Sequence, residues 1–476
     1  MKIISNSEKK YNQPISLVIF GATGDLAQHK IVPALFDLYT KGYLPDVFHI
    51  IGFSRRDWSH EEYREFVSKS LEKCRVKCTP ADRKHFLAKV FFQGGVFDDK
   101  KAYINLSELL NSINKRIKQR SSSLFYLSVP PNLYDGILKM LSKQKLVTKS
   151  VDSSRWDRVL IEKPFGYDVK SARKLDMNLV KLFTEEQIFR IDHYIAKDTL
   201  QNILAFRFSN SIFEPIMNSK SVEKIEIRML EGNNLATRGA FYDSIGALRD
   251  VGQNHLLQIL AAVTMNNPGS FNAESISHQR AILLRKLKKI SSFKNHVLRG
   301  QYEDYTSDPG VKADSETETF FRIKTEINTA RWHGVPIILE AGKGFKESII
   351  DVKIHFQMHT ANMCKITDHK NCGCNVLTFR LKPNEEISID LWVKKPGVEN
   401  DLLSSEFKFD YKNIEGTTAD AYERVLYDAI RGDKTLFTNT EEVRASWRFI
   451  SPIIEGWKNL PLIKYPKGAL DSSEIN

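Results

Sequence analysis

The sequence has few of the features that mark secreted or membrane proteins. It contains five cysteines in 476 residues, a sparse and odd set that predicts a reducing compartment and no disulfide framework. The N-terminal residues include no long apolar stretch of the kind that secretory signals carry. Apolar runs such as residues 256–263 are too short to cross a bilayer. We also find no internal repeat and no low-complexity linker, so we expect a soluble, cytoplasmic protein without membrane contact.

The composition indicates a folded chain of more than one domain. Hydrophobic residues make up 42% and aromatic residues 11% of the chain, which excludes a mostly disordered protein. A length of 476 residues exceeds one ordinary core. The formal net charge of +12 suits anionic partners such as nucleic acids, membrane surfaces or phosphorylated small molecules. The densest basic run, residues 285–289, is predicted to lie on a solvated helix face, so we expect no nucleic-acid partner.

The first part of the chain alternates strand and helix patterns, which indicates a parallel sheet. A buried strand at 14–20 is followed at once by a turn containing Gly21 and Gly24, and then by a helix. Glycines let the backbone approach a pyrophosphate, and a helix N-terminus offers free N–H groups to it. The G-x-x-G spacing lacks one glycine of the usual dinucleotide fingerprint, so a plain tight turn remains an alternative.

The end of the second predicted strand, 48–53, favours NADP over NAD. An acidic residue here would bind the ribose 2′-hydroxyl, whereas an arginine such as Arg55 suits a 2′-phosphate. A surface arginine pair is the alternative. Thr23 and Lys30 could add a hydroxyl and a charge to the same phosphates. Further strands at 123–129 and 159–161 precede prolines, and Lys163, before Pro164, is predicted to project into the same cleft, with a cis bond possible between the two.

Residues 190–198 concentrate acidic, basic and aromatic side chains, and we expect them to hold the anionic end of a substrate beside the cofactor. His255 is predicted to begin an apolar helix, where Asp192 could orient its imidazole and stabilise the imidazolium. A base with such an orienting carboxylate is what removing an alcohol proton requires during hydride transfer to a nicotinamide. A structural histidine, with Asp250 as the N-cap of its helix, is the alternative.

After residue 197 the pattern changes to long alternating strands without intervening helices, which predicts a mostly antiparallel sheet. We therefore expect α/β plus α+β architecture: a Rossmann-like dinucleotide-binding domain at 1–192 and a larger β+α domain at 193–476. The predicted strands of the second domain are 222–229, 319–323, 337–340, 351–356, 376–381, 386–393 and 406–411, and its main helices are 199–206, 256–263, 420–431 and 440–456.

Taken in order, the motifs closely resemble those of the glucose-6-phosphate dehydrogenase family. The joint presence of RIDHY, EKPFG and NHLLQ is far more specific than G-x-x-G alone. The matching stretches cover nearly the whole chain: GATGDLAQHK (21–30), GFSRR (52–56), FYLSVPP (125–131), EKPFG (162–166), RIDHYIAKD (190–198), RDVGQNHLLQ (249–258), RWHGVPIILEAGK (331–343), KKPG (394–397), DAYERVLYDAIRGD (420–433) and SWRFISPII (446–454).

The resemblance implies oxidation of D-glucose 6-phosphate at C1 to 6-phosphoglucono-δ-lactone with hydride transfer to NADP+, the first oxidative step of the pentose phosphate pathway. It also implies a homodimer or homotetramer whose interface is formed by the antiparallel sheet. By position, the resemblance assigns the substrate phosphate to His193, Tyr194 and Lys197, the base to His255 with Asp192 as its partner, the sugar to Glu231, Asp250, Lys163 and Lys343, and the coenzyme to Gly21, Thr23, Gly24, Asp25, Lys30 and Arg55, with Lys163 lining both sites.

Several positions depart from the family pattern. Ala196 and Asp198 replace the usual Gly and Glu, and Ala240 stands where a second Gly is common. Ser348 falls where many members carry an Arg near the sugar, which predicts weaker sugar affinity. The residues of the additional, structural NADP site of some animal members are replaced, so we expect one NADP per subunit. The positions concerned are Cys374, Ser388 and Asp390.

Two other functions remain open at this point. Ser348 is compatible with a sugar-phosphate dehydrogenase of shifted substrate or coenzyme preference. A non-catalytic NADP-binding regulatory or scaffold protein is the other, although the intact lysines, Asp192 and His255 argue against it. A cysteine and histidine cluster fits no standard zinc-finger spacing, and we expect no metal site there. Its members are His355, His359, Cys364, His369, Cys372 and Cys374.

Overall fold

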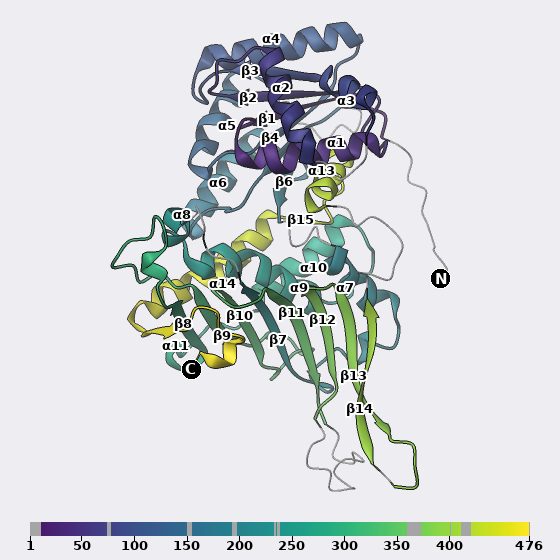
Figure 1. Ribbon diagram of the computed structural model, residues 1–476, viewed down its shortest axis with the longest axis vertical. Coiled ribbons are helices and arrows are strands. Elements are labelled where there is room, and N and C mark those ends of the chain that lie inside the picture. The colour runs from purple at the N-terminus through teal and green to yellow at the C-terminus, as the bar shows by residue number, and fades with distance from the viewer. Residues whose placement is uncertain are drawn as a thin grey trace.

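Two β-sheets organise the computed structural model, one in each half of the chain (Figure 1). In the view of Figure 1 the first sheet lies above the second, and helices α9, α10 and α14 lie between them. None of the described helices is long and apolar enough to cross a membrane. The structure describes residues 11–73, 78–149, 155–192, 198–232, 235, 239–358, 373–399, 401–410 and 420–475.

The first sheet has the strand order β15-β6-β5-β4-β1-β2-β3, and all its strands except β15 run parallel. Every residue of central strand β1 is buried, as expected for a strand covered on both faces. This confirms the Rossmann-like fold. The elements are β1 (Ile15–Phe20), α1 (Val32–Thr40), β2 (Phe48–Ser54), α2 (His60–Ser70), α3 (Pro80–Leu87), β3 (Val90–Gly94), α4 (Lys100–Ile117), β4 (Ser122–Leu127), α5 (Tyr134–Lys143), β5 (Asp157–Ile161), α6 (Val169–Leu182) and β6 (Ile188–Ile191).

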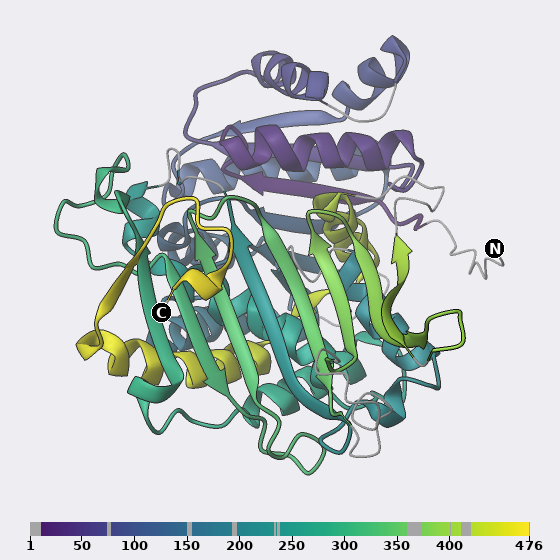
Figure 2. The same ribbon diagram turned by 60° about the horizontal axis from the view of Figure 1, so that its bottom comes forward.

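The second sheet has the order β14-β13-β12-β11-β7-β10-β9-β8-β16 and is mostly antiparallel, as predicted. Only the pairs β7–β10 and β8–β16 are parallel among its described strands. Helices cover one of its faces, and Figure 2 shows the strands from the other side. The strands are β7 (Val222–Glu231), β8 (Val297–Tyr302), β9 (Phe320–Thr325), β10 (Ile337–Lys343), β11 (Ile349–Phe356), β12 (Val376–Lys382), β13 (Glu386–Lys394), β14 (Leu402–Asp410) and β16 (Leu462–Tyr465).

Three helices of the second half, those that begin at Ala273, Ala421 and Thr440, have a capping side chain at the N-terminus. Asn439, for example, caps α14 by accepting from the Glu442 N–H, and the Glu442 carboxylate accepts from the Asn439 N–H in return. The helices are α7 (Asp198–Ser209), α8 (Gly239–Asp243), η7 (Leu248–Leu256), α9 (Leu257–Thr264), α10 (Ala273–Arg285), α11 (Phe293–His296), α13 (Ala421–Arg431) and α14 (Thr440–Gly456).

One segment of the second half packs into the first. Helix α13 contributes Val425 and Leu426 to the hydrophobic core that surrounds the first sheet. The short strand β15 (Phe437–Thr438) then pairs antiparallel with β6. The predicted domain boundary at residue 192 stays a prediction, and this segment crosses it.

The prediction for the basic run 285–289 is wrong in part. Helix α10 ends at Arg285, and Lys286 is its C-cap. Leu287 is buried and pairs with Ile327 in an isolated bridge. The buried leucine, rather than the charges around it, therefore determines the local backbone.

Candidate active site

The imidazole of His255 lies beyond the carboxyl ends of β5 and β6. These strands are parallel, with Ile161 beside Arg190. Lys163 lies two residues after Ile161, and Asp192 lies two residues after Arg190. Asp192 Oδ1 lies 2.6 Å from His255 Nδ1, and Lys163 Nζ lies 2.7 Å from Nε2. Because ligands of doubly wound sheets bind at the carboxyl ends of strands, this is the expected place for reacting groups.

A π-helix, η7, carries His255 into this position. Its hydrogen bonds join residues five apart, and Asp250 and His255 have this spacing. Lys163 contacts both, since its ammonium also donates to the Asp250 backbone oxygen at 3.1 Å and lies 3.4 Å from Oδ1. The structure corrects two expectations: Asp250 lies inside η7 rather than capping it, and His255 lies near the end of η7 rather than at the start of α9.

Burial and charge together set the protonation of His255. Its side chain is 2% exposed, and that of Asp192 is 1% exposed. Burial lowers the pKa of the imidazole; the Asp192 carboxylate raises the pKa, and the Lys163 ammonium lowers it. A neutral imidazole that donates Nδ1–H to Asp192 and accepts from Lys163 at Nε2 satisfies both contacts.

A second pair of predicted residues lies at the ends of β7 and β10. These strands are parallel, with Glu231 beside Lys343, and the two side chains form an ion pair. The Lys343 ammonium also lies 5.4 Å from the centroid of the buried Tyr242 ring. Burial and then the nearby Asp250 raise the pKa of the Tyr242 phenol. Tyr242 thus lies between Lys343 and the η7 residues.

Two residues of this site were not singled out from the sequence. One is Tyr242, whose signal was only its place within the TRGAFYD stretch. The other is Asn254, whose side-chain oxygen accepts from the His255 N–H at 2.6 Å and whose amide donates to the Asp250 oxygen at 3.0 Å. Asn254 precedes His255 directly, but adjacency alone does not reveal a supporting role.

Ser348 closes the loops near the sugar residues. Its hydroxyl accepts from the Gly232 N–H at 3.1 Å, one residue beyond Glu231. Ser348 therefore makes a local backbone contact. Its effect on sugar affinity stays a prediction.

A cleft of about 1080 Å³ opens along the carboxyl edge of β1, β2 and β4. Gly21 forms the turn after β1 with φ +82°, and a Cβ there would lie 2.2 Å from the Ser128 oxygen. Only glycine fits this close approach of two loops. The cleft is lined by Gly21, Thr23, Gly24, Ser54, Arg55, Arg56, Val96, Phe97, Asp98, Ser128, Val129, Pro130, Asn132, Leu133 and Gly136.

Two predicted coenzyme residues lie elsewhere on the turn and helix. Asp25 is exposed and does not line this cleft. The Lys30 ammonium lies 3.9 Å from Asp420 Oδ2 and 5.9 Å from the Tyr422 ring centroid. The structure therefore brings Gly21, Thr23, Gly24 and Arg55 together in the cleft, and the roles of Asp25 and Lys30 stay predictions.

Other predicted residues fall outside the described part of the chain. These include the three expected phosphate ligands, His193, Tyr194 and Lys197, and also Ala196.

In the cysteine and histidine cluster only His355 and Cys374 are described. Cys374 Sγ lies 3.7 Å from His355 Nδ1, and His355 Nε2 lies 2.7 Å from Glu226. Among the described residues no three His, Cys, Asp or Glu side chains are grouped to hold a metal.

The sequence matches two family models that together span nearly the whole chain. Residues 18–202 match "Glucose-6-phosphate dehydrogenase, NAD binding domain", and residues 204–476 match "Glucose-6-phosphate dehydrogenase, C-terminal domain". The chain belongs to the glucose-6-phosphate dehydrogenase family. This confirms the family resemblance drawn from the motifs.

Individual members of the glucose-6-phosphate dehydrogenase family are similar over most of their length. A glucose-6-phosphate 1-dehydrogenase of Chlamydia pneumoniae is 35% identical, covering 97% of this chain and 94% of its own. Glucose-6-phosphate 1-dehydrogenase 5, cytoplasmic, of Arabidopsis thaliana is 37% identical, covering 94% and 87%. A solved structure described as glucose-6-phosphate dehydrogenase in complex with its substrate glucose-6-phosphate is 33% identical, covers 98% and 96%, and has a TM-score of 0.88.

Proposed function

We propose that this protein oxidises glucose 6-phosphate at C1 to the δ-lactone and transfers the hydride to NADP+, with His255 as the general base. The observation that carries the proposal is the row Asp192–His255–Lys163 at the carboxyl ends of β5 and β6, in which Asp192 and His255 are buried. The names of the relatives, and the substrate named in the complex of the similar structure, support the same reaction.

His255 would take the proton of the C1 hydroxyl at Nε2 as hydride leaves C1. Asp192 fixes the tautomer, because its carboxylate accepts Nδ1–H at 2.6 Å and leaves the Nε2 lone pair on the side of Lys163. The same carboxylate then stabilises the imidazolium formed by proton transfer. Burial keeps the pKa of His255 low, so the imidazole is neutral and able to accept a proton near pH 7.

Lys163 contacts the atom to which the substrate hydroxyl must donate. The hydroxyl therefore has to take the place of the ammonium at Nε2, and Lys163 retains its contacts with the Asp250 main chain and carboxylate. In that position the ammonium faces the reacting end of the sugar, where it can donate to a sugar oxygen. Before the substrate binds, Lys163 lowers the pKa of His255. Once the substrate is bound, Lys163 would orient it.

Sugar recognition falls to the charged groups next to this row. Asp250 and the Glu231–Lys343 pair offer carboxylate acceptors and an ammonium donor to hydroxyl groups. His193, Tyr194 and Lys197 would hold the phosphate, an assignment that rests on the resemblance. Three donors including a fixed cation suit a phosphate dianion.

The cleft at the edge of the first sheet fits a dinucleotide. Gly21 and Gly24 keep its floor free of side chains, Thr23 adds a hydroxyl, and Arg55 lies at the end of β2. NADP+ held in this cleft would supply the nicotinamide as hydride acceptor. The Arg55 guanidinium, a charge-assisted donor to phosphate, supports NADP over NAD, with Asp25 and Lys30 as further proposed contacts.

We infer that the protein works as a homodimer or homotetramer formed through the second sheet. Edge strand β14 exposes Phe407 (56%), Phe409 (46%) and Leu403 (38%). Exposed apolar side chains on an edge strand need a cover in solution. Sedimentation of F407D beside the wild type tests the interface, since a charged edge should shift the protein toward monomers.

A cytoplasmic location is proposed as well, and the Arabidopsis relative carries that word in its name.

The decisive assay measures NADPH formation for H255N beside the wild type. Removing the base should lower kcat by about 10² to 10⁴-fold, with the Kd for glucose 6-phosphate nearly unchanged. Near-normal turnover of H255N would reject the mechanism. The wild-type kcat/KM for glucose 6-phosphate, free glucose and other hexose phosphates, with NADP+ and NAD+, decides between this enzyme and one of shifted preference. NADP binding without turnover on any sugar phosphate would indicate a non-catalytic protein.

A further inference from the structure

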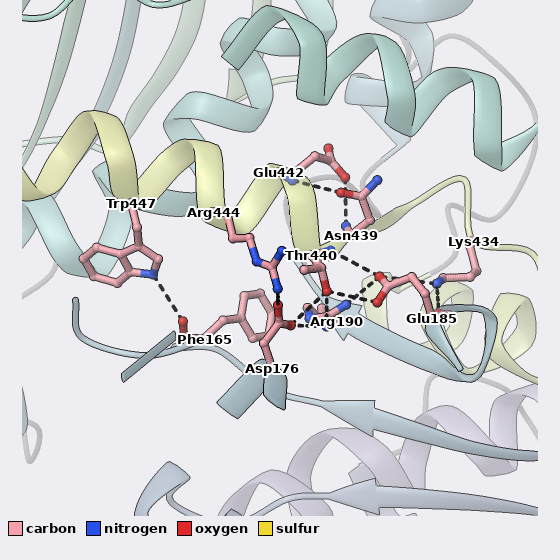
Figure 3. Close-up of polar contacts among 10 residues, drawn as sticks. All are labelled: Phe165, Asp176, Glu185, Arg190, Lys434, Asn439, Thr440, Glu442, Arg444 and Trp447. Carbon is pink, nitrogen blue, oxygen red and sulfur yellow. Dashed lines mark hydrogen bonds and ion pairs between the residues drawn. The ribbon is translucent and has the colours of Figure 1, made fainter. Parts of the chain in front are cut away.

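Helix α14 of the second half contacts residues that lie close in sequence to Asp192 and Lys163. It packs against α6 in the first half and against η7, which carries His255. Figure 3 shows its polar contacts with residues of the first half. One helix therefore contacts η7, which carries the imidazole, and residues of the first half near Asp192 and Lys163.

At its N-terminus α14 holds the strand that leads to Asp192. Arg190, 1% exposed, lies two residues before Asp192. Its Nη2 donates to Thr440 Oγ1 and to Asp176 Oδ1, both at 2.7 Å, and its Nη1 donates to Glu185 Oε1 at 2.7 Å. Thr440 is the first residue of α14, and its hydroxyl also lies 2.8 Å from Asp176 (Figure 3). The end of β6 is thus fixed through a neutral hydroxyl from the other half.

Backbone pairing strengthens the same junction. Thr438 pairs with Arg190 and Phe437 with Ile191, so β15 supports β6 up to the residue before Asp192. Thr440 follows β15 by two residues. Strand β15, which precedes α14, and Thr440, the first residue of α14, therefore both contact β6.

Seven residues further on, α14 holds the segment that leads from Lys163. The buried Trp447 donates Nε1–H to the Phe165 oxygen at 3.2 Å (Figure 3). Phe165 lies two residues after Lys163. The contacts at Arg190 and Phe165 thus flank the positions whose side chains contact His255 Nδ1 and Nε2.

We propose that α14 is a brace that sets Asp192 and Lys163 against His255, with Arg190, Thr440 and Trp447 as positioning residues. This inference rests on the proposed roles of His255 and Asp192. The brace acts through distance: a displacement of about 1 Å at a reacting group can cost about 10²-fold in rate. The Arg190 end controls the carboxylate side of the imidazole, and the Trp447 end controls the ammonium side.

The sharpest variant is T440V, which removes the hydroxyl with little change in shape. It leaves Arg190 its carboxylates, Asp176 and Glu185, and leaves β6 paired with β15, so the strand stays folded but loses the hydroxyl contact from α14. We expect kcat to fall about tenfold or more, with the KM for glucose 6-phosphate and the Kd for NADP+ within about twofold of the wild type. T440S, which keeps the hydroxyl, should restore kcat. R190K is the second variant, because lysine cannot reach all three partners at once.

The pH profile separates positioning from a stability effect. Among the described residues, Asp192, Lys163 and Asp250 are charged groups that act on His255, and Asp192 raises the pKa of the imidazole. A carboxylate that moves away should shift the acid limb of kcat/KM to lower pH in T440V. W447F acts on the other side: if the Lys163 ammonium moves away, the limb should shift to higher pH. Opposite shifts from the two ends of one helix are not expected from general destabilisation.

The charges around Arg190 provide a matched control. Arg444 of α14 contacts Asp176 at 2.9 Å but is 60% exposed, and Lys434 lies beside Glu185. R444A removes an exposed ion pair of small energetic value from the same helix, so it should leave kcat and the pH profile unchanged. T440V with wild-type kcat and pH profile, beside an inactive H255N, would overturn the brace alone. Full turnover of H255N would overturn both the base and the brace.

Discussion

Replacing Asp192 by Asn isolates the contribution of the carboxylate to the proposed base. The side chain keeps its size and 1% exposure, so the change is one of charge and hydrogen bonding. Asparagine can turn its amide N–H toward His255 Nδ1, which selects the tautomer with a proton on Nε2. That tautomer cannot accept the substrate proton. Even with the correct tautomer, the imidazolium would lose a charge-assisted hydrogen bond made at 2.6 Å.

The expected loss follows from these two effects. A hydrogen bond to a charged group contributes about 1.5–3 kcal/mol, which corresponds to roughly 10 to 150-fold in rate. The tautomer effect adds to this, and the equivalent Asp-to-Asn change in a serine protease costs about 10⁴-fold. We therefore expect kcat of D192N to fall by between about 10² and 10⁴-fold, with the Kd for NADP+ unchanged.

The pH dependence adds a sign to the prediction. In the wild type, kcat/KM should fall as pH decreases through the imidazole pKa, which burial holds below its usual 6.5. Asp192 raises the pKa of His255, so its loss should move the acid limb to lower pH while the plateau decreases. The measurement is steady-state kcat/KM across pH for both proteins.

A matched control separates catalysis from folding. Asp351 is also 1% exposed and pairs with Arg228 between β11 and β7, away from His255. Breaking such a buried pair costs about 3–5 kcal/mol of unfolding free energy, so D351N measures the effect of stability on activity at a temperature where both variants are folded. If D192N keeps its activity within twofold of the wild type, or loses no more than D351N, the assigned role of Asp192 is wrong.

Two further predictions concern the coenzyme cleft. R55A should raise the KM for NADP+ by roughly 10 to 150-fold, the equivalent of about 1.5–3 kcal/mol, and leave the KM for NAD+ unchanged. R56A, beside it in the cleft, should have a smaller effect. Equal losses for NAD+ and NADP+ in R55A would contradict the 2′-phosphate assignment. G21A places a Cβ 2.2 Å from the Ser128 oxygen at φ +82°. The backbone strain of about 1–2 kcal/mol and the clash should lower both the Tm and the affinity for NADP+, which thermal shift with and without NADP+ measures. An unchanged Tm would contradict the close approach.

The sheets were predictable because their strands have strong local patterns. Residues 15–20 are apolar except for Ser16 and become the fully buried centre of the first sheet. The alternating residues 222–229 become β7, with one face buried. Strand β6 was missed because it contains Arg190, a residue rarely buried. Its burial depends on Asp176, Glu185 and Thr440, and Thr440 lies 250 residues away in the sequence.

The candidate site was predicted in its residues but not in its local geometry. The sequence suggested that Asp192 serves His255, and the structure brings the two together across 63 positions. The π-helix was not predicted, since a spacing of five between Asp250 and His255 has no distinct signal in the sequence. The contact between Lys163 and the imidazole depends on the parallel register of β5 and β6 and on where η7 lies. Both are tertiary properties.

The position of Lys163 makes the resting site different from the reacting one. In the structure the ammonium contacts His255 Nε2, the atom that must receive the substrate proton. An ammonium there disfavours protonation of the imidazole, so the base stays neutral until the hydroxyl arrives. The substrate can displace Lys163 because Asp250 already accepts from the same ammonium. In the proposed mechanism, a local exchange of hydrogen bonds at Lys163 therefore presents Nε2 of His255 to the sugar.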